Sequence, residues 1–246
     1  MEKEEYLRMY HLENSHWWYV GMRWVNRAFL GPAGAGNRRV LDAGCGTGAG
    51  MDFLEEYGHS YGVDLAKESM DFCRIRGKER VTQASVDRLP FPEASFDLVT
   101  SFDVLYHRAV VDDLSALREF HRVLKGGGHL LVRVPAFDFL RGHHDAMVHT
   151  RHRYHSAELV AKLKEVGMVV ERVSYANFLL FPLALVKRAL ERNGDAASDL
   201  RPTLRPINAI LTRLLAAEAC WLKRNSFPFG LSLVALARKP LEEQPD

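Results

Sequence analysis

One short segment constrains the fold of this chain more than any other part: an apolar strand that ends in an acid and then in alternating glycines. The strand is followed by Asp42 and by Gly44, Gly46 and Gly48. Glycines allow a sharp turn from a strand into a helix and let the backbone approach a ligand closely. The segment therefore predicts a strand, a ligand-binding turn and a helix. The glycines alone also satisfy the dinucleotide fingerprint and are weak evidence.

Two acids narrow the choice of ligand. Asp42 lies two residues before the first glycine, where a carboxylate would repel a pyrophosphate and attract an ammonium or sulfonium group. Asp64 ends the next predicted strand, where an acid can accept hydrogen bonds from ribose hydroxyls. Together they favour a nucleoside with a cationic tail. The alternative is that Asp42 only caps a helix and Asp64 only begins a turn.

Strands and helices alternate through most of the chain, which predicts a parallel sheet covered on both faces. A helix is expected over residues 4–30, and Ser156 is a candidate N-cap for a helix that Gly167 ends. Further helices are expected over 49–56, 67–76 and 112–124. Strands are expected over 39–42, 60–64, 81–84, 96–101, 129–134, 168–174 and 230–238.

Composition limits the class of protein. The chain has 246 residues and a formal net charge of +2, which does not suggest a nucleic-acid binder. Its 3 cysteines, Cys45, Cys73 and Cys220, cannot form a disulfide framework, and no structural zinc site is predicted. The N-terminus is acidic rather than that of a signal peptide, and the longest apolar run, 178–186, is about half of the ~20 residues that span a bilayer. We expect a cytoplasmic protein, with peripheral membrane contact left open.

Four segments in this order resemble the class I S-adenosylmethionine-dependent methyltransferases: Val40 to Gly48, Gly62 to Asp64, Leu89 to Val99, and Arg122 to Gly128. The resemblance covers roughly residues 39–175 and the last strand. It implies an α/β, Rossmann-like fold, with a seven-stranded, mostly parallel sheet and helices on both faces. It also implies S-adenosyl-L-methionine as cofactor and S-adenosyl-L-homocysteine as product. The aromatic N-terminal helix and a basic segment at 149–154 resemble a bacterial small-molecule subgroup whose motifs dictate no single reaction.

The resemblance also implies where the cofactor binds. The glycine turn holds the methionine end, Asp64 binds the ribose, and Ser85 and Val86 border the adenine, although many relatives have Asp in place of Ser85. Tyr19 and Arg23 lie four residues apart on one helix face and either reach the cofactor from a lid or belong to ordinary packing. The predicted cofactor-binding set is Asp42, Gly44, Cys45, Gly46, Gly48, Asp64, Leu65, Ser85, Val86, Phe102, Tyr19 and Arg23.

Tyr106 and His107 follow the fourth strand and are the catalytic candidates. His107 is a general base or a residue that shapes the pocket, and Tyr106 orders the substrate. The segment 141–155 contains five histidines, three arginines and a single acid, Asp145. It is a solvated basic loop, an anion-binding patch or, with less support, a metal site. The predicted substrate-binding residues are Arg141, His144, His149, Arg151, Arg153 and Tyr154, and no metal ligand is predicted.

Four parts of the chain are expected: an N-terminal helical lid (1–36), a cofactor-binding core (37–175), a helical cap inserted between strands six and seven (176–230), and the final strand with a tail (231–246). We expect methyl transfer to a small, anionic or amphiphilic acceptor, such as an isoprenoid phosphate, a lipid-linked sugar or an acidic metabolite. The alternatives are an NAD-type oxidoreductase and a non-catalytic module that binds S-adenosylmethionine.

Overall fold

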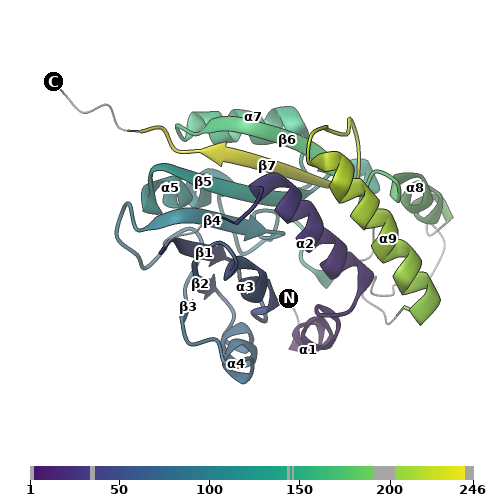
Figure 1. The fold of residues 1–246 in the computed structure, drawn as a ribbon, viewed down its shortest axis with the longest axis horizontal. Coiled ribbons are helices and arrows are strands. Elements are labelled where there is room, and N and C mark those ends of the chain that lie inside the picture. Colours follow the sequence, from purple (N-terminus) through teal and green to yellow (C-terminus); the bar gives the residue numbers. More distant parts are fainter. Residues whose placement is uncertain (1–2, 34–36, 143–144, 146, 191–202, 242–246) are drawn as a thin grey trace.

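The computed structural model describes residues 3–33, 37–142, 145, 147–190 and 203–241, drawn in colour in Figure 1. Its centre is a seven-stranded sheet in the order β3-β2-β1-β4-β5-β7-β6. The strands are β1 (Arg39–Ala43), β2 (His59–Asp64), β3 (Val81–Gln83), β4 (Phe96–Phe102), β5 (Leu124–Pro135), β6 (Val169–Ala176) and β7 (Ser232–Arg238). Neighbours among β1 to β5 pair in parallel, whereas β7 is antiparallel to β5 and β6. The predicted seven-stranded, mostly parallel sheet is confirmed.

Helices cover both faces of this sheet (Figure 1). The described helices are α1 (Lys3–Leu12), α2 (Trp17–Leu30), α3 (Ala49–Leu54), α4 (Lys67–Ile75), α5 (Asp113–Val123), the 3-10 turn η1 (Asp138–Leu140), α7 (Ser156–Glu165), α8 (Phe181–Leu190) and α9 (Arg205–Leu222). Successive residues of β5 point to opposite faces of the sheet and pack against the two layers of helices. Leu130 and Val132 pack in the core beneath α5 and α7, and Leu131 packs beneath α2 and α9.

The N-terminal region is two helices rather than the single helix predicted over 4–30. The side chain of His16 caps α2 by accepting the N–H of Trp18 at 3.4 Å. Asn208 of α9 accepts the N–H of Trp17 at 2.8 Å and donates to the carbonyl of Ser15 at 3.0 Å. The break is therefore held by a residue 191 positions from Trp17, a contact that local periodicity cannot indicate.

The helix predicted after Tyr154 exists as α7, but the predicted N-cap is wrong. Ser156 is the first helical residue, His155 occupies the cap position, and no side chain caps the helix there. The N–H of Ser156 instead donates to the hydroxyl of Tyr175 on β6 at 3.1 Å. A tertiary contact therefore satisfies one of the free N–H groups at the start of this helix.

Helix α2 lies beside α9 on one face of the sheet (Figure 1). Met22, Val25 and Phe29 are buried against the sheet and against α9. A Cβ added to Gly21 would lie 2.2 Å from a methyl carbon of Leu215, so glycine permits the close approach of the two helices. The predicted lid and cap thus both contribute a helix to the core. No helix among the described residues is long and apolar enough to cross a membrane.

We predict that Met22→Ala lowers the free energy of unfolding by about 2–5 kcal/mol, because it removes a buried side chain and leaves a cavity between α2 and the sheet. Urea unfolding followed by circular dichroism measures the change. Leu7→Ala, at a side chain of α1 that is 47% exposed, is the control and should stay within about 0.5 kcal/mol. Equal losses in both variants would contradict a core role for α2.

Candidate active site

A cavity of about 830 Å³ opens where β1, β2, β4 and β5 end. Parallel strands expose their ligand crevice at this edge, so the position agrees with the prediction from the glycine turn. Of the predicted cofactor-binding residues, Gly48 is outside the lining and begins α3. The others all line the cavity: Asp42, Gly44, Cys45, Gly46, Asp64, Leu65, Ser85, Val86, Phe102, Tyr19 and Arg23.

The glycine turn brings the backbone to the cavity wall. Gly44 has φ +99°, and a Cβ added there would lie 2.1 Å from a methyl carbon of Val104, which follows β4. Gly46 has φ +54° and donates its N–H to the carboxylate of Asp64 at 3.0 Å. A side chain at Gly44 would therefore be strained and would collide with the neighbouring strand end. The turn leaves room for a ligand only because it lacks these side chains.

Asp64 joins the turn after β1 to the end of β2. One carboxylate oxygen accepts the N–H of Gly46, and the other accepts the N–H of Ala66 at 2.9 Å. Burial raises the pKa of Asp64, and these two backbone donors act in the opposite direction. Each oxygen retains a second lone pair for a ligand hydroxyl, so the geometry fits the predicted contact with a ribose.

Asp42 is the most strongly perturbed acid at this end of the cavity. Its side chain is buried, and one carboxylate oxygen accepts the hydroxyl of Thr100 at 3.0 Å. Burial, together with the charge of Asp64, raises the pKa of Asp42 to about 7 although the Thr100 hydrogen bond lowers it. A cation placed beside Asp42 would favour its ionised form, so the residue fits a ligand that carries an ammonium or sulfonium group.

Helix α1 and the chain after it hold the outer side of the glycine turn. The buried carboxylate of Glu13 accepts the hydroxyl of Thr47 within the turn and an N–H of Arg76 at 2.5 Å. Arg23 donates to the carbonyl of Glu13 at 2.8 Å. Sequence reasoning missed Glu13 because it lies in an acidic segment with no motif around it. Arg23 lines the cavity, and one of its donors serves this junction.

A buried arginine at the cavity wall, Arg133, was also missed. It lies opposite Phe102 in the β4–β5 register and donates to Asp103 at 2.9 and 2.6 Å. Its guanidinium carbon is 5.1 Å from the ring centroid of Trp18 and 5.0 Å from that of Phe102, within the range of cation–π contacts. Only the paired strands bring these residues together. Asp103 has φ +58°, so this cavity-lining carboxylate is held in a strained backbone conformation.

The catalytic candidates Tyr106 and His107 both line the cavity. The Nδ1 of His107 accepts the N–H of Ala109 at 3.1 Å, so its neutral ring carries the proton on Nε2. Burial, with His149 nearby, lowers the pKa of His107 to about 4, and the ring is neutral at pH 7. In this geometry His107 can donate a hydrogen bond, whereas a general base would need Nδ1 to be released. Burial raises the pKa of Tyr106, which keeps its hydroxyl protonated.

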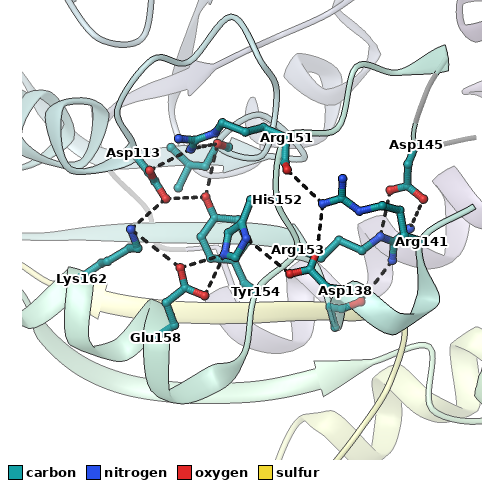
Figure 2. A network of polar contacts seen from close by, with 12 residues as sticks. Asp113, Asp138, Arg141, Asp145, Arg151, His152, Arg153, Tyr154, Glu158 and Lys162 are labelled. Atoms are coloured by element: carbon teal, nitrogen blue, oxygen red, sulfur yellow. Dashed lines mark hydrogen bonds and ion pairs between the residues drawn. The ribbon is translucent and has the colours of Figure 1, made fainter.

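Ion pairs hold Arg141, Arg151 and Arg153 of the basic segment in place (Figure 2). Asp113 accepts hydrogen bonds from Arg151 at 2.8 Å and from Tyr154 at 2.7 Å. Burial opposes its charge, but these two donors and Lys162 lower the pKa of Asp113 well below its usual value. The described residues contain no group of three or more His, Cys, Asp or Glu that could hold a metal ion.

Of the predicted substrate-binding residues that the structure describes, only Arg153 lines the cavity. It donates to both oxygens of Asp145 at 2.8 and 3.0 Å and to the carbonyl of Ala136 at 3.1 Å (Figure 2). Three of its five N–H groups make these bonds, which leaves two as donors. Described residues of the predicted set that are outside the lining are Arg141, His149, Arg151 and Tyr154. His144 lies outside the described residues.

Fold and site together define an α/β domain with an acidic, glycine-lined ligand cavity at the carboxyl edge of its sheet. Residues 41–132 match a protein family described as "Methyltransferase domain". A Mycobacterium tuberculosis protein named "Probable S-adenosylmethionine-dependent methyltransferase" is 34% identical over 137 residues, which are 54% of this chain and 49% of that protein. A Geobacter protein named "Ubiquinone/menaquinone biosynthesis C-methyltransferase" is 35% identical over 127 residues, 46% of this chain and 52% of that protein.

One solved structure with the same fold is a Haloferax volcanii methyltransferase in complex with the Trm112 methyltransferase activator. The TM-score is 0.63 and the sequences are 20% identical; the match covers 98% of this chain and 97% of that one. The chain spans about half the length of the curated relatives named above. Residues 41–132 are therefore a methyltransferase domain of the class I S-adenosylmethionine-dependent type. The methyl donor of this family is S-adenosylmethionine, and the carboxylates and glycines around the turn fit it.

We predict that Asp42 makes the stability of the ligand-free protein pH-dependent. Its folded-state pKa, about 7, is above the ordinary value of about 4, so the folded state holds a proton that the unfolded state has lost. Its contribution to the free energy of unfolding therefore falls as the pH rises from about 4 to about 7. Urea unfolding across this range should show a smaller fall for Asp42→Asn.

The matched control is Asp71→Asn, at a carboxylate that is 54% exposed on α4. Its pH profile should follow that of the unchanged protein. Asp42→Asn keeps an oxygen that can accept the Thr100 hydroxyl, so the comparison isolates the buried charge. An Asp42→Asn profile identical to that of the unchanged protein would contradict a raised pKa at this position.

Proposed function

We propose that this protein transfers the methyl group of S-adenosylmethionine to a small amphiphilic acceptor with an anionic group. The observation that carries the proposal is one continuous cavity with two chemically different ends. One end has the glycine turn with Asp42 and Asp64, and the other has apolar walls and the buried Arg153. Ligand sites of this kind are mostly apolar with a few placed polar groups.

The cofactor end is proposed to work by orientation. When bound, S-adenosylmethionine supplies an electrophilic methyl group on its sulfonium. Asp64 would accept hydrogen bonds from the ribose hydroxyls, and the carboxylate of Asp42 would attract the cationic end of the molecule. Ser85 and Val86 would border the adenine, while Tyr19 and the aromatic side of α2 exclude water from the reacting atoms. Alignment of donor and acceptor then provides most of the rate enhancement.

The acceptor end is proposed to recognise an apolar body and one polar head. Its apolar lining consists of Leu140, Val148, Leu180, Leu183, Ala184, Leu211 and Leu231. The two remaining donors of Arg153 would bind a phosphate or carboxylate, and Tyr106 and His107 would contact the acceptor near the methyl group. The Geobacter relative supports this class, since its name refers to quinones, which are amphiphilic molecules.

An acceptor with a long apolar tail is dissolved in a bilayer. The proposal therefore includes contact between a membrane and the part of the chain predicted as the cap, 176–230. Helices α8 and α9 support this contact, because both contribute apolar side chains to the acceptor end of the cavity.

We predict that Asp64→Ala weakens the binding of S-adenosylmethionine and S-adenosylhomocysteine by roughly 10- to 100-fold, because it removes a hydrogen-bonded carboxylate worth about 1–3 kcal/mol. Isothermal titration calorimetry measures both affinities. Asp71→Ala, on the exposed side of α4, is the control and should bind as the unchanged protein does. Tight binding of NAD with no heat from S-adenosylmethionine would refute the proposal and favour an oxidoreductase.

The chemical class of the acceptor can be identified from the mass of the methylated product. Incubation with isotopically labelled S-adenosylmethionine and a panel of isoprenoid phosphates, anionic lipids, sugars and aromatic acids should label an amphiphilic anion. Cofactor binding with no labelled product in any class would favour a non-catalytic module.

Once the acceptor is identified, the double variant Asp145→Asn/Arg153→Gln can be tested on it. We predict that the KM for the acceptor rises at least about tenfold, as expected for a lost charge-assisted hydrogen bond of ~1.5–3 kcal/mol. The two amides can still bond to each other, so no charge is left buried alone. The matched control is Asp138→Asn/Arg141→Gln, a pair in the same segment outside the cavity lining. An unchanged KM in the first variant, with cofactor affinity intact, would show that Arg153 does not bind the acceptor.

A further inference from the structure

Six aromatic side chains form a continuous row across the end of the molecule that carries α8. We call this row the aromatic ridge: Trp221, Phe227, Phe178, Phe229, Phe181 and Phe139, in spatial order. Successive ring centroids lie 6.2, 4.5, 4.6, 5.0 and 6.5 Å apart. Three members are open to solvent: Trp221 is 53% exposed, Phe139 64% and Phe229 37%. The chain thus displays several large rings at its surface, where a continuous apolar patch marks an interaction site.

Helix α9 extends this apolar surface away from the ridge. Ile207, Ile210 and Leu214 are 46%, 56% and 36% exposed, and their spacing places them on one helix face. Trp221 continues the same row two turns further on. The adjacent face of α9, which carries Leu215, Ala219 and Leu222, is buried against α2 and the sheet. The apolar surface of the helix is therefore wider than the part that packs within the chain.

The charge around this surface is positive. Arg205, Arg213, Lys223 and Arg224 are all exposed on α9 or directly after it. Glu218 is the single carboxylate among the described residues from 177 to 231, and it is 1% exposed. Beside Phe139, Asp138 is already paired with Arg141 at 2.9 Å. The surface therefore offers uncompensated positive charge next to apolar side chains, a combination that suits an anionic partner.

The same surface borders the acceptor end of the cavity. Leu183 of α8 is 65% exposed and also lines the cavity. Leu180 and Ala184 of the same segment, and Leu211 of α9, contribute to the lining as well. Apolar side chains therefore form a continuous path from the surface to the cavity, along which an apolar molecule can pass.

We propose that the aromatic ridge and the outer face of α9 dock on the surface of an anionic lipid bilayer. The rings would lie at the boundary between headgroups and acyl chains, and the four cations would contact lipid phosphates. A second copy of the chain is a poorer occupant, since a two-fold interface would bring the same positive residues together. Docking rests on the proposed function only in that the acceptor would enter the cavity from the bilayer.

The test is flotation of the full chain with vesicles. Vesicles of phosphatidylglycerol mixed with phosphatidylcholine should carry the protein, vesicles of phosphatidylcholine alone should carry much less, and added salt should lower the binding. Phe139→Ser/Trp221→Ser should lower the partition coefficient at least about tenfold, since both rings are exposed and leave the bilayer contact. Lys223→Ser/Arg224→Ser should lower the preference for the anionic vesicles, because two of the four cations are lost.

Ile75→Ser is the matched control, because this side chain is 68% exposed at the end of α4, away from α8 and α9 (Figure 1). It should float as the unchanged protein does. No flotation with either vesicle, or an equal loss in Ile75→Ser, would overturn the proposal. A dimer in light scattering that Trp221→Ser dissociates would assign the surface to a second copy instead.

Calorimetry with S-adenosylhomocysteine separates this proposal from the proposed function. Flotation without cofactor binding would refute the methyltransferase activity and leave the docking surface standing. Cofactor binding without flotation would refute docking, and with it the proposed membrane contact of the cap, and would leave methyl transfer standing.

Discussion

Two hydrogen bonds to one half-buried carboxylate organise the ligand end of this protein. Asp64 accepts N–H groups from Gly46 and Ala66, which ties the turn after β1 to the end of β2. Burial opposes the charge of that carboxylate, and the two donors compensate for part of the cost. Gly46 presents its N–H in this direction at a φ of +54°, a conformation that costs glycine less than a residue with a side chain. The acidic end of the cavity, beside Asp42, depends on this junction.

The arginines at the cavity wall are held by hydrogen bonds to carboxylates or to a backbone carbonyl. Arg133 is bonded to Asp103 and Arg153 to Asp145, while Arg23 donates to a backbone carbonyl. Buried pairs of this kind contribute little net stability, but losing one partner leaves a costly unpaired charge. The pairs therefore act mainly by holding the shape of the cavity. An acceptor would be selected by apolar fit and by the few donors that remain.

The helices that close the cavity are also part of the core. Helix α2 packs on the sheet through Met22 and Val25 while Tyr19, on the same helix, lines the cavity. Helix α9 packs beside it and contributes Leu211 to the acceptor end. A motion of either helix as a rigid lid would expose core side chains, so changes that admit ligands must be smaller than the release of a whole helix. Stability and access are coupled through the same two elements.

The succession of strands along the chain, the glycine turn and the positions of Asp42 and Asp64 were predictable from the sequence, because strand periodicity and glycine conformation are local properties. The family followed from the same segments. The break before α2 was not predictable, since it depends on Asn208, nor was the pairing of Arg151 with Asp113. A sequence shows how many charged residues a segment contains. Only the tertiary structure decides which of them form ion pairs. The partners lie far along the chain, and strand register and helix packing bring them close.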